Sequence, residues 1–562
     1  MENFIEEKLI GYSAMKRMYI YGLVVIVIAL SSFTVADHYF EISRNIDVFT
    51  ALYKDINASY VDDANPSKLM RTCIDGMLKT LDPFTNYISE SQIETYRIQN
   101  SEKLVGIGIR FQLQDSVPVV TDLIKDLPAD KADIQIGDII TALDGKTTIG
   151  KTYDEVSQAL RGQTGTNVSV SLKTINGQSK EITLARQEFQ ETNVPFYGML
   201  TKNIGCINLK IFNPNAGKDV KEAYEKLKKE NSDLKGIILD LRGNPGGLLA
   251  EAVNVVNVFV DKNKLVVTTK GRVSEWNSTF KTLNDPTDTK IPVVVITDNK
   301  SASASEIVSG CIQDYDRGVV IGQRTYGKGL VQVTKNLSYN TMLKVTTAKY
   351  YIPSGRCIQA ILYAEHNEDG SVKRVPDSLK KEFKTAAGRR VWDGGGIDPD
   401  LPLIKGATNP VVQSLQAQHV LFDFATQYKT DHATILPAAQ FHLSDADYDA
   451  FIVFALKKKF SYKTECDKLL EKLKDAAKEE KYYDAVKAQY EDIVKKLEAD
   501  KQTALSRNKK EVISLLENEI CGRYYYLNGK IEKSLENDPL AIKAIELLNN
   551  PQGEYNDLLS KK

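Results

Sequence analysis

The stretch LKGIILDLRGNPGGLLAEAVNVVNVFV, residues 234–260, joins an apolar run to a helical pattern through a cluster of glycines. LKGIILDLR is apolar at most positions, as is typical of a strand buried on both faces of a parallel sheet. LLAEAVNVVNVFV repeats its apolar residues at helical spacing. The same alternation recurs in IPVVVITD and ASEIVSGCIQDY, residues 291–298 and 304–315. Residues 187–404 are therefore predicted to form an α/β core.

Three other regions differ from this core in pattern. Residues 103–186 are short β-branched runs punctuated by glycine, with TYDEVSQALRG as one amphipathic helix, and predict a compact β-rich module. Residues 37–102 are helical in pattern, and residues 405–562 are helical and strongly charged. In this last region a helical hairpin or bundle is favoured over an oligomerising coiled coil, because the heptad pattern breaks at Glu480 and Lys501.

The N-terminal end contains a run that can cross a bilayer. Residues 18–36, MYIYGLVVIVIALSSFTVA, carry no charge and follow Lys16 and Arg17. Basic residues on this side place residues 1–17 in the cytoplasm and the rest of the chain outside, in the cell envelope. Residues 34–36 also fit a signal-peptidase site, which would release a soluble periplasmic or secreted protein. An uncleaved inner-membrane anchor is favoured, because the apolar run is longer than a usual signal-peptide core.

Charge and cysteine content exclude several functions. The chain has 73 basic and 74 acidic residues, a net charge of -1, which argues against nucleic-acid binding. Its 6 cysteines are widely spaced, without a CxxC pair or a Cys/His cluster. Neither a metal site nor a dense disulfide framework is therefore predicted.

NKSASASEIVSG, residues 299–310, holds three serines at alternate positions. Its residues 303–306 form a capping-box pattern, which on its own favours a structural role for Ser303. A catalytic serine would need a base within hydrogen-bond reach. The 5 histidines are His38, His366, His419, His432 and His442. A Ser-His-Asp triad formed within the β-rich module and the core up to Glu365 is therefore excluded.

A lysine can replace histidine as the base when burial lowers its pKa. The candidate is Lys328 in GQRTYGKGLVQ, residues 322–332, where glycines on both sides allow close backbone approach. The segment also fits the GxxxxGK pattern of a phosphate loop. Gly329 stands where that loop needs Ser or Thr, however, and a strand rather than a helix is expected to follow. Nucleotide binding is therefore rejected.

The glycine cluster DLRGNPGG, residues 240–247, follows the apolar strand and precedes a helix. Its free backbone amides face whatever lies beyond the strand end. In acyl transfer, one of these amides and the amide of Ala304 would make an oxyanion hole. The local pattern alone is explained equally by a tight strand-to-helix turn, which is the simpler interpretation.

Together these segments resemble the C-terminal processing peptidases, also called tail-specific proteases. The similar motifs are YVDDANPSKLMRTCIDGMLKTLDPFTNYI (60–88), LVGIGIRFQL (104–113), DLPADKADIQIGDIITALDGK (126–146), DLRGNPGG (240–247) and the segment 299–332. The resemblance covers roughly residues 40–404 and leaves 405–562 unmatched. It implies a crotonase/ClpP-like ββα core with an inserted PDZ domain and a helical C-terminal region.

The resemblance also implies roles for individual residues. The catalytic group consists of Ser303 as nucleophile, Lys328 as general base and Gln332, which orients the lysine amine. The oxyanion hole consists of the amides of Gly247 and Ala304, with Gly246 as a near alternative. Ser301 and Ser305 would be structural, and Asp314 and Arg324 would support the site.

The PDZ-like stretch implies how substrates are held. Its loop, Gly106, Ile107, Gly108 and Ile109, would present amides to a C-terminal carboxylate, and a strand edge would receive the peptide. Val156 and Leu160 would line the pocket for the last side chain. Leu127 and Asp133 depart from the family pattern, which more often has a small residue and a glycine there.

The implied function is an envelope serine endopeptidase that recognises substrate C-termini and cleaves with a Ser/Lys dyad. Its expected partners are proteins with exposed C-termini, and no cofactor is implied. One alternative is a non-catalytic PDZ scaffold that binds protein tails at the membrane; tail binding without proteolysis would favour it. Another is lipid or cofactor binding in a crotonase-like core, for which the sequence offers no carrier pocket. Homo-oligomerisation or adaptor binding through the helical regions stays open.

Overall fold

The computed structural model of the chain describes residues 39–99, 104–367, 369, 371–403 and 409–560. The chain folds as two units, residues 1–83 and 84–562. In the first, a helix spans residues 39–59 and α2 spans Pro66–Lys79. The predicted membrane segment, residues 18–36, lies outside the described residues. Within the described ranges, no helix combines the length and the apolar character that crossing a bilayer requires.

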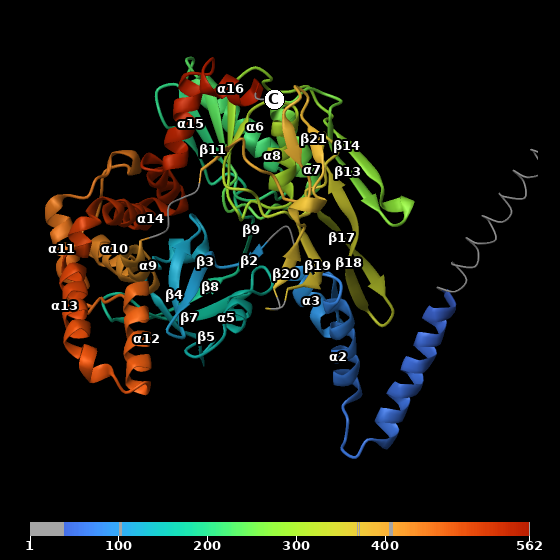
Figure 1. Cartoon of the computed structure of the whole chain (residues 1–562), viewed down its shortest axis with the longest axis horizontal. Coiled ribbons are helices and arrows are strands. Elements are labelled where there is room, and N and C mark those ends of the chain that lie inside the picture. Colours follow the sequence, from blue (N-terminus) through green and yellow to red (C-terminus); the bar gives the residue numbers. More distant parts are fainter. Residues whose placement is uncertain (1–38, 100–103, 368, 370, 404–408, 561–562) are drawn as a thin grey trace, which may run out of the picture. The chain divides into compact units, whose positions relative to one another are not determined.

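The second unit contains a six-stranded sheet ordered β10-β11-β12-β15-β16-β23, of which β11 is labelled in Figure 1. The β10–β11 pair is antiparallel, and the other neighbours are parallel. The strands span Phe196–Met199 (β10), Ile204–Asn208 (β11), Gly236–Asp240 (β12), Val293–Thr297 (β15), Val319–Gly322 (β16) and Leu401–Pro402 (β23). The opening stretch of the sequence analysis thus supplies β12, a central strand buried at every position.

Helices cover both faces of this sheet. On one face pack α6 (Ala216–Glu230), α7 (Leu249–Phe259) and α8 (Ala304–Asp314). On the other pack α15 (Pro539–Asn549) and α16 (Glu554–Ser560), the last two helices of the chain. Strands as apolar as β15 need cover on both sides, and the C-terminal end of the chain provides the second cover. The helices predicted after residue 404 are therefore in part an integral layer of the core.

A second, five-stranded sheet follows the order β1-β18-β13-β14, with β17 also paired to β18. Its strands span Asn86–Ile88 (β1), Leu265–Gly271 (β13), Ser278–Lys281 (β14), Leu330–Leu337 (β17) and Thr341–Tyr351 (β18). The helix α3 spans Glu90–Gln99. Two short hairpins follow, formed by β19 (Ile361–His366) with β20 (Val372–Arg374), and by β21 (Glu382–Lys384) with β22 (Arg390–Trp392). The β17–β18 pair carries the segment just after Lys328.

The predicted β-rich module is an insert with its own sheet and core, ordered β3-β4-β5-β7-β8 with β6 on β5. Its elements span Ile109–Gln114 (β3), Val117–Leu123 (β4), Pro128–Lys131 (α4), Ile139–Leu143 (β5), Lys146–Thr147 (β6), Tyr153–Leu160 (α5), Asn167–Lys173 (β7) and Ser179–Ala185 (β8). The chain enters through β2 (Leu104–Gly106) and leaves through β9 (Gln187–Phe189), which pair antiparallel. β3 pairs with β4 alone among the described strands, so its other edge is open to a peptide.

The remaining helices form a bundle, and all of them except α12 contribute to a separate apolar core. They span Pro410–Ala417 (α9), Val420–Asp431 (α10), Asp445–Lys457 (α11), Glu465–Glu479 (α12), Tyr483–Arg507 (α13) and Lys509–Glu536 (α14). α12 and α13 form a helical hairpin, in which the Lys474 ammonium lies over the rings of Tyr483 and Tyr490. The α/β core, the β-rich insert and the helical C-terminal region expected from the sequence are all present.

Candidate active site

Ser303 occupies a strained position at the start of a buried helix. It precedes α8, every residue of which is buried, and its backbone angles are φ 56° and ψ −112°. Residues other than glycine rarely adopt these backbone angles. Backbone strain of this kind is concentrated at functional sites. The Ser303 side chain is itself 7% exposed. The turn therefore holds one hydroxyl at the N-terminal, electropositive end of the helix.

Glu306 joins the Ser303 turn to the Lys328 segment. The Ser303 amide donates to Glu306 Oε2 at 2.8 Å, which is the glutamate half of the predicted capping box. The Lys328 amide donates to the same oxygen at 2.8 Å, and the Gly327 amide donates to Oε1 at 2.7 Å. Burial raises the pKa of Glu306, although these hydrogen bonds oppose the rise. One carboxylate thus contacts both halves of the predicted dyad.

Lys328 lies between two closely packed glycines just before β17. Its ammonium is 4.3 Å from the centre of the Phe84 ring. A Cβ at Gly327, where φ is 89°, would lie 2.2 Å from the Cβ of Ala360, so only glycine fits there. The Gly329 amide donates to Gln359 Oε1 at 2.7 Å. A strand follows, as expected for a segment that is not a phosphate loop.

Gln332 lies on β17 at a β-bulge between Val331 and Gln332. Its Nε2 donates to Thr346 Oγ1 on β18 at 3.2 Å. This hydrogen bond restrains the amide group from the neighbouring strand. The predicted role of Gln332 in orienting the lysine amine stays a prediction.

The glycine turn after β12 packs directly against the Ser303 turn. A Cβ at Gly246 would lie 2.8 Å from the Ser303 Cβ and 2.7 Å from the Ala302 carbonyl oxygen. The Gly246 amide donates to Asn244 Oδ1 at 2.9 Å. Among the described residues, by contrast, no acceptor bonds to the amides of Gly247 and Ala304. These two amides are therefore available to donate, and their predicted role as oxyanion-hole donors stays a prediction.

The neighbouring serine hydroxyls are engaged elsewhere. Ser301 Oγ donates to the Leu241 carbonyl at 2.9 Å, and Ser305 Oγ donates to the Asn244 carbonyl at 3.0 Å. Both hydroxyls therefore tie α8 and its preceding turn to the glycine-rich segment.

Tyr350 is a site residue that the sequence interpretation missed. It lies on β18 and is 7% exposed. Burial raises the pKa of Tyr350, and the nearby Ser303 side chain opposes that rise. The phenol therefore stays protonated at neutral pH beside the candidate nucleophile. No local pattern in the sequence indicates this contact, because it depends on how two sheets pack.

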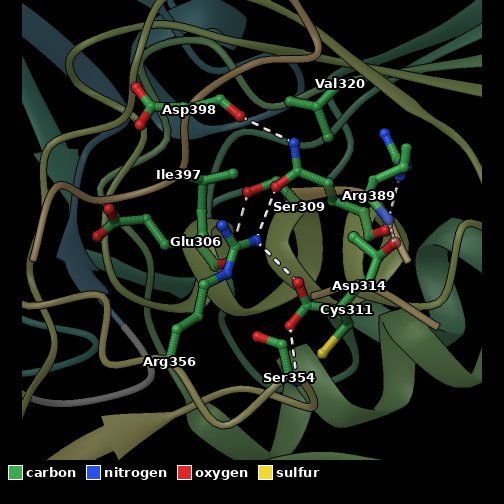
Figure 2. A network of polar contacts seen from close by, with 12 residues as sticks. Glu306, Ser309, Cys311, Asp314, Val320, Ser354, Arg356, Arg389, Ile397 and Asp398 are labelled. Carbon is green, nitrogen blue, oxygen red and sulfur yellow. Dashed lines mark hydrogen bonds and ion pairs between the residues drawn. The ribbon is translucent and has the colours of Figure 1, made fainter. Parts of the chain in front are cut away.

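The far end of α8 is anchored by a buried polar network (Figure 2). Arg356 donates to Asp314 Oδ1 at 2.9 Å and to Gln313 Oε1 at 2.7 Å, and the Ser354 amide donates to Asp314 at 2.9 Å. Asp314, predicted to support the site, thus lies at the opposite end of α8 from Ser303. Arg324, the other predicted supporting residue, forms a more exposed pair with Asp398.

A groove between β3 and α5 brings together most of the predicted substrate-binding residues. Its volume is about 300 Å³, and its lining includes Gly106, Ile107, Gly108, Ile109 and Leu160. Val156 does not line this groove; it is 2% exposed and lies in the core of the β-rich insert. Tyr153 and Ser157 are the α5 residues that line the groove together with Leu160.

The two departures from the family pattern both have structural explanations. A Cβ at Gly108, where φ is 85°, would lie 2.5 Å from the Cβ of Leu127, so Leu127 packs onto the binding loop. Asp133 adopts φ 56°, the left-handed conformation that glycine adopts most easily.

One group of side chains in the described part of the chain has the composition of a metal site: His442, Glu517 and Glu536. The buried Lys533 ammonium lies 2.6 Å from Glu536 Oε2 and 3.1 Å from Glu517 Oε2. The positive charge beside these two carboxylates is therefore that of a lysine side chain of the protein itself.

Comparison with known proteins agrees with this architecture. Residues 203–366 match the model of peptidase family S41, and residues 119–174 match a PDZ domain model. Residues 411–548 match a model described as probable PDZ-protease, C-terminal helical domain. The chain is therefore similar to the peptidases of family S41 in its core, to PDZ domains in its β-rich insert and to PDZ-proteases in its C-terminal helices.

Two curated relatives are similar over just over half of the chain. A probable CtpA-like serine protease of Staphylococcus haemolyticus is 37% identical over 311 residues, covering 54% of this chain and 61% of the relative. One of Staphylococcus aureus strain MRSA252 is 35% identical over 317 residues, covering 56% and 62%. The alignments thus span about three fifths of these relatives. Among solved structures, a photosystem II D1 C-terminal processing protease is 24% identical, with a TM-score of 0.35, covering 66% of this chain and 95% of that one.

Proposed function

We propose that this protein is a serine endopeptidase that captures the C-terminus of a protein substrate on its PDZ domain and cleaves a peptide bond with Ser303 and Lys328. The observation that carries the proposal is the strained Ser303 turn, packed against Gly246 and joined through Glu306 to the backbone of Lys328. A structural helix cap needs neither the strain nor the adjoining pair of unbonded amides.

In the proposed reaction, the neutral amine of Lys328 takes the proton of the Ser303 hydroxyl as Oγ bonds to the substrate carbonyl carbon. The amides of Gly247 and Ala304 stabilise the negative charge that develops on the carbonyl oxygen. The C–N bond then breaks, and the leaving amine takes the proton back from Lys328. Water attacks the acyl-enzyme with Lys328 again as base, which releases the carboxylate product and restores Ser303.

The experiment that tests this function combines cleavage with covalent labelling. The purified protein is incubated with a protein carrying an unstructured apolar C-terminal tail, and separately with a fluorophosphonate probe that reacts with activated serines. We expect cleavage, and a single label that peptide mapping assigns to Ser303. The label should be lost in Ser303→Ala and kept in Ser309→Ala, a buried serine of the same helix whose hydroxyl donates to the Ser305 and Glu306 carbonyls of α8. Binding of the tail with neither cleavage nor label would favour the scaffold alternative.

A second prediction concerns the PDZ groove. Ser157→Trp places a large ring between α5 and the open edge of β3, where it should block an added peptide strand. We expect KM for the tailed protein to rise about tenfold or more, a loss of roughly 1.4 kcal/mol of binding. Hydrolysis of a short untailed peptide should stay near the wild-type rate.

The control for this prediction is Gln158→Trp, at an exposed neighbouring position of α5 that does not line the groove. Equal losses in both variants, or equal losses on tailed and untailed substrates, would contradict recognition through this groove.

We also propose that residues 18–36 anchor the protein in the inner membrane with its catalytic part in the periplasm, because this run is uncharged and follows Lys16 and Arg17. Membrane fractionation with N-terminal sequencing tests it. A soluble product beginning near Asp37 would instead support signal-peptide cleavage.

A further inference from the structure

The side chain of Glu306 is the meeting point of four hydrogen bonds. It is fully buried on the first turn of α8. Its partners are the amides of Ser303, Gly327 and Lys328 and the hydroxyl of Thr325. Ser303 precedes α8, whereas the other three lie beyond β16, so the carboxylate connects two segments separated in sequence by a helix and a strand.

The division of these bonds between the two oxygens is specific. Oε2 accepts from Ser303 and Lys328, each at 2.8 Å. Oε1 accepts from Thr325 at 2.6 Å and from Gly327 at 2.7 Å. Glu306 Oε2 alone therefore bonds to the main chain at both Ser303 and Lys328, and it sets the distance between these two backbone positions.

We propose that Glu306 is a positioning residue that holds the Ser303 turn and the Lys328 segment at the spacing needed for proton transfer. This inference rests on the function proposed above and extends it to a residue that touches neither the substrate nor the reacting atoms.

The chemistry of the group fits this task. Two carboxylate oxygens offer about four lone-pair sites, which match three amide N–H groups and one hydroxyl, all of them donors. A neutral amide could satisfy only part of this set, because its NH₂ end would face donors. Bonds to an ionised acceptor are also shorter and stronger than neutral ones. Burial raises the pKa of Glu306 and the four hydrogen bonds oppose that rise, so the donors favour the ionised form.

Another contact joins the same segments but not at the reacting residues. The Tyr326 amide donates to the Ser301 carbonyl at 3.0 Å. This bond keeps the two segments together if Glu306 is changed, and the Lys328 segment is also held to a third segment, because the Thr325 hydroxyl accepts from the Ile397 amide at 2.7 Å. Loss of Glu306 should therefore misplace Ser303 and Lys328 without separating the segments.

Glu306→Gln tests the proposal in the full-length protein. The substitution keeps the shape of the side chain but replaces one acceptor oxygen by a donor, so one pair of hydrogen bonds is lost. We expect kcat for a tailed protein to fall about 10- to 100-fold, as a small misplacement of reacting groups produces. KM should stay within about threefold, because the PDZ groove contains no part of this network. Fluorophosphonate labelling of Ser303 should slow by a factor similar to that for kcat.

The matched control is Ser309→Ala, on the next turn of the same buried helix. If kcat and the labelling rate of Glu306→Gln stay within twofold of wild type while the protein is folded, the proposal is overturned. If Glu306→Gln does not fold, Thr325→Val decides instead, because it removes one of the four hydrogen bonds. A lower kcat at unchanged KM in this variant supports the proposal, and an unchanged kcat overturns it.

Failure of the proposed function gives a different result. In that case the wild-type protein neither cleaves the tailed substrate nor takes up the probe at Ser303. Failure of the Glu306 inference requires a wild-type protein that does both.

Discussion

Lys328→Arg is expected to abolish peptide cleavage although it keeps the positive charge. Arginine stays protonated at every working pH and cannot accept the Ser303 proton, whereas a lysine amine can. The variant should still place a cation near the Phe84 ring, which lies 4.3 Å from the lysine ammonium. We expect kcat to fall by roughly 10³-fold or more, as when a general base is removed from a catalytic group that acts as a unit. Steady-state cleavage of a tailed protein measures this effect.

A matched control lies further along the same strand. Lys335 is on β17, and its ammonium lies 4.8 Å from the centre of the Trp276 ring. Lys335→Arg changes a lysine above an aromatic ring in the same way and should leave kcat within about twofold. Substantial activity in Lys328→Arg would mean that the residue acts through its charge alone, and another base would have to be sought.

The sequence was most informative where chemically important residues lie at the ends of strands and helices or within one continuous stretch. Ser303, Lys328 and the glycine cluster each lie at a strand or helix end, so their places in the fold could be anticipated from the segments that contain them. The same holds for the PDZ loop, where Gly106 to Ile109 form a continuous stretch and line one groove. In these cases the pattern along the chain determines which groups lie together.

Contacts between distant segments could not be anticipated. Glu306 was recognised only as half of a capping box, because its bonds to Thr325, Gly327 and Lys328 depend on the crossing from α8 through β16. The contact of Tyr350 with Ser303 likewise depends on the packing of β18 against the start of α8.

The orientation of a residue on its helix and the packing of the last helices were also beyond the sequence pattern. Val156 and Leu160 on α5 both belong to the core of the PDZ domain, but only Leu160 also lines the groove. The apolar strands of the main sheet require a second layer of helices. Their sequence does not specify that α15 and α16 form this layer.

Arg356→Met is expected to destabilise the protein strongly, because it leaves Asp314 buried without its cation. Both side chains are almost completely buried, with exposures of 1% and 0%, and their ion pair measures 2.9 Å. Removal of one partner from a buried pair costs about 3–5 kcal/mol. The control is Arg324→Met, which breaks a pair whose side chains are 50% and 40% exposed and should cost less than about 1 kcal/mol. Urea denaturation of the three proteins measures the difference.

The pH dependence of this variant distinguishes an unpaired charge from a simple packing defect. Burial already raises the pKa of Asp314, and Arg356 opposes that rise. Without Arg356, the folded-state pKa should rise further above its unfolded value, so the folded variant loses stability relative to the unfolded chain as Asp314 ionises. The loss of unfolding free energy relative to wild type should therefore shrink as the pH falls toward the range in which carboxylates of the unfolded chain titrate, and grow as the pH rises.

The double variant Arg356→Met/Asp314→Asn should recover much of the lost stability, since no buried charge is then left unpaired and asparagine can still accept from the Ser354 amide. A deficit that is independent of pH and unchanged in the double variant would assign the loss to the missing arginine side-chain packing.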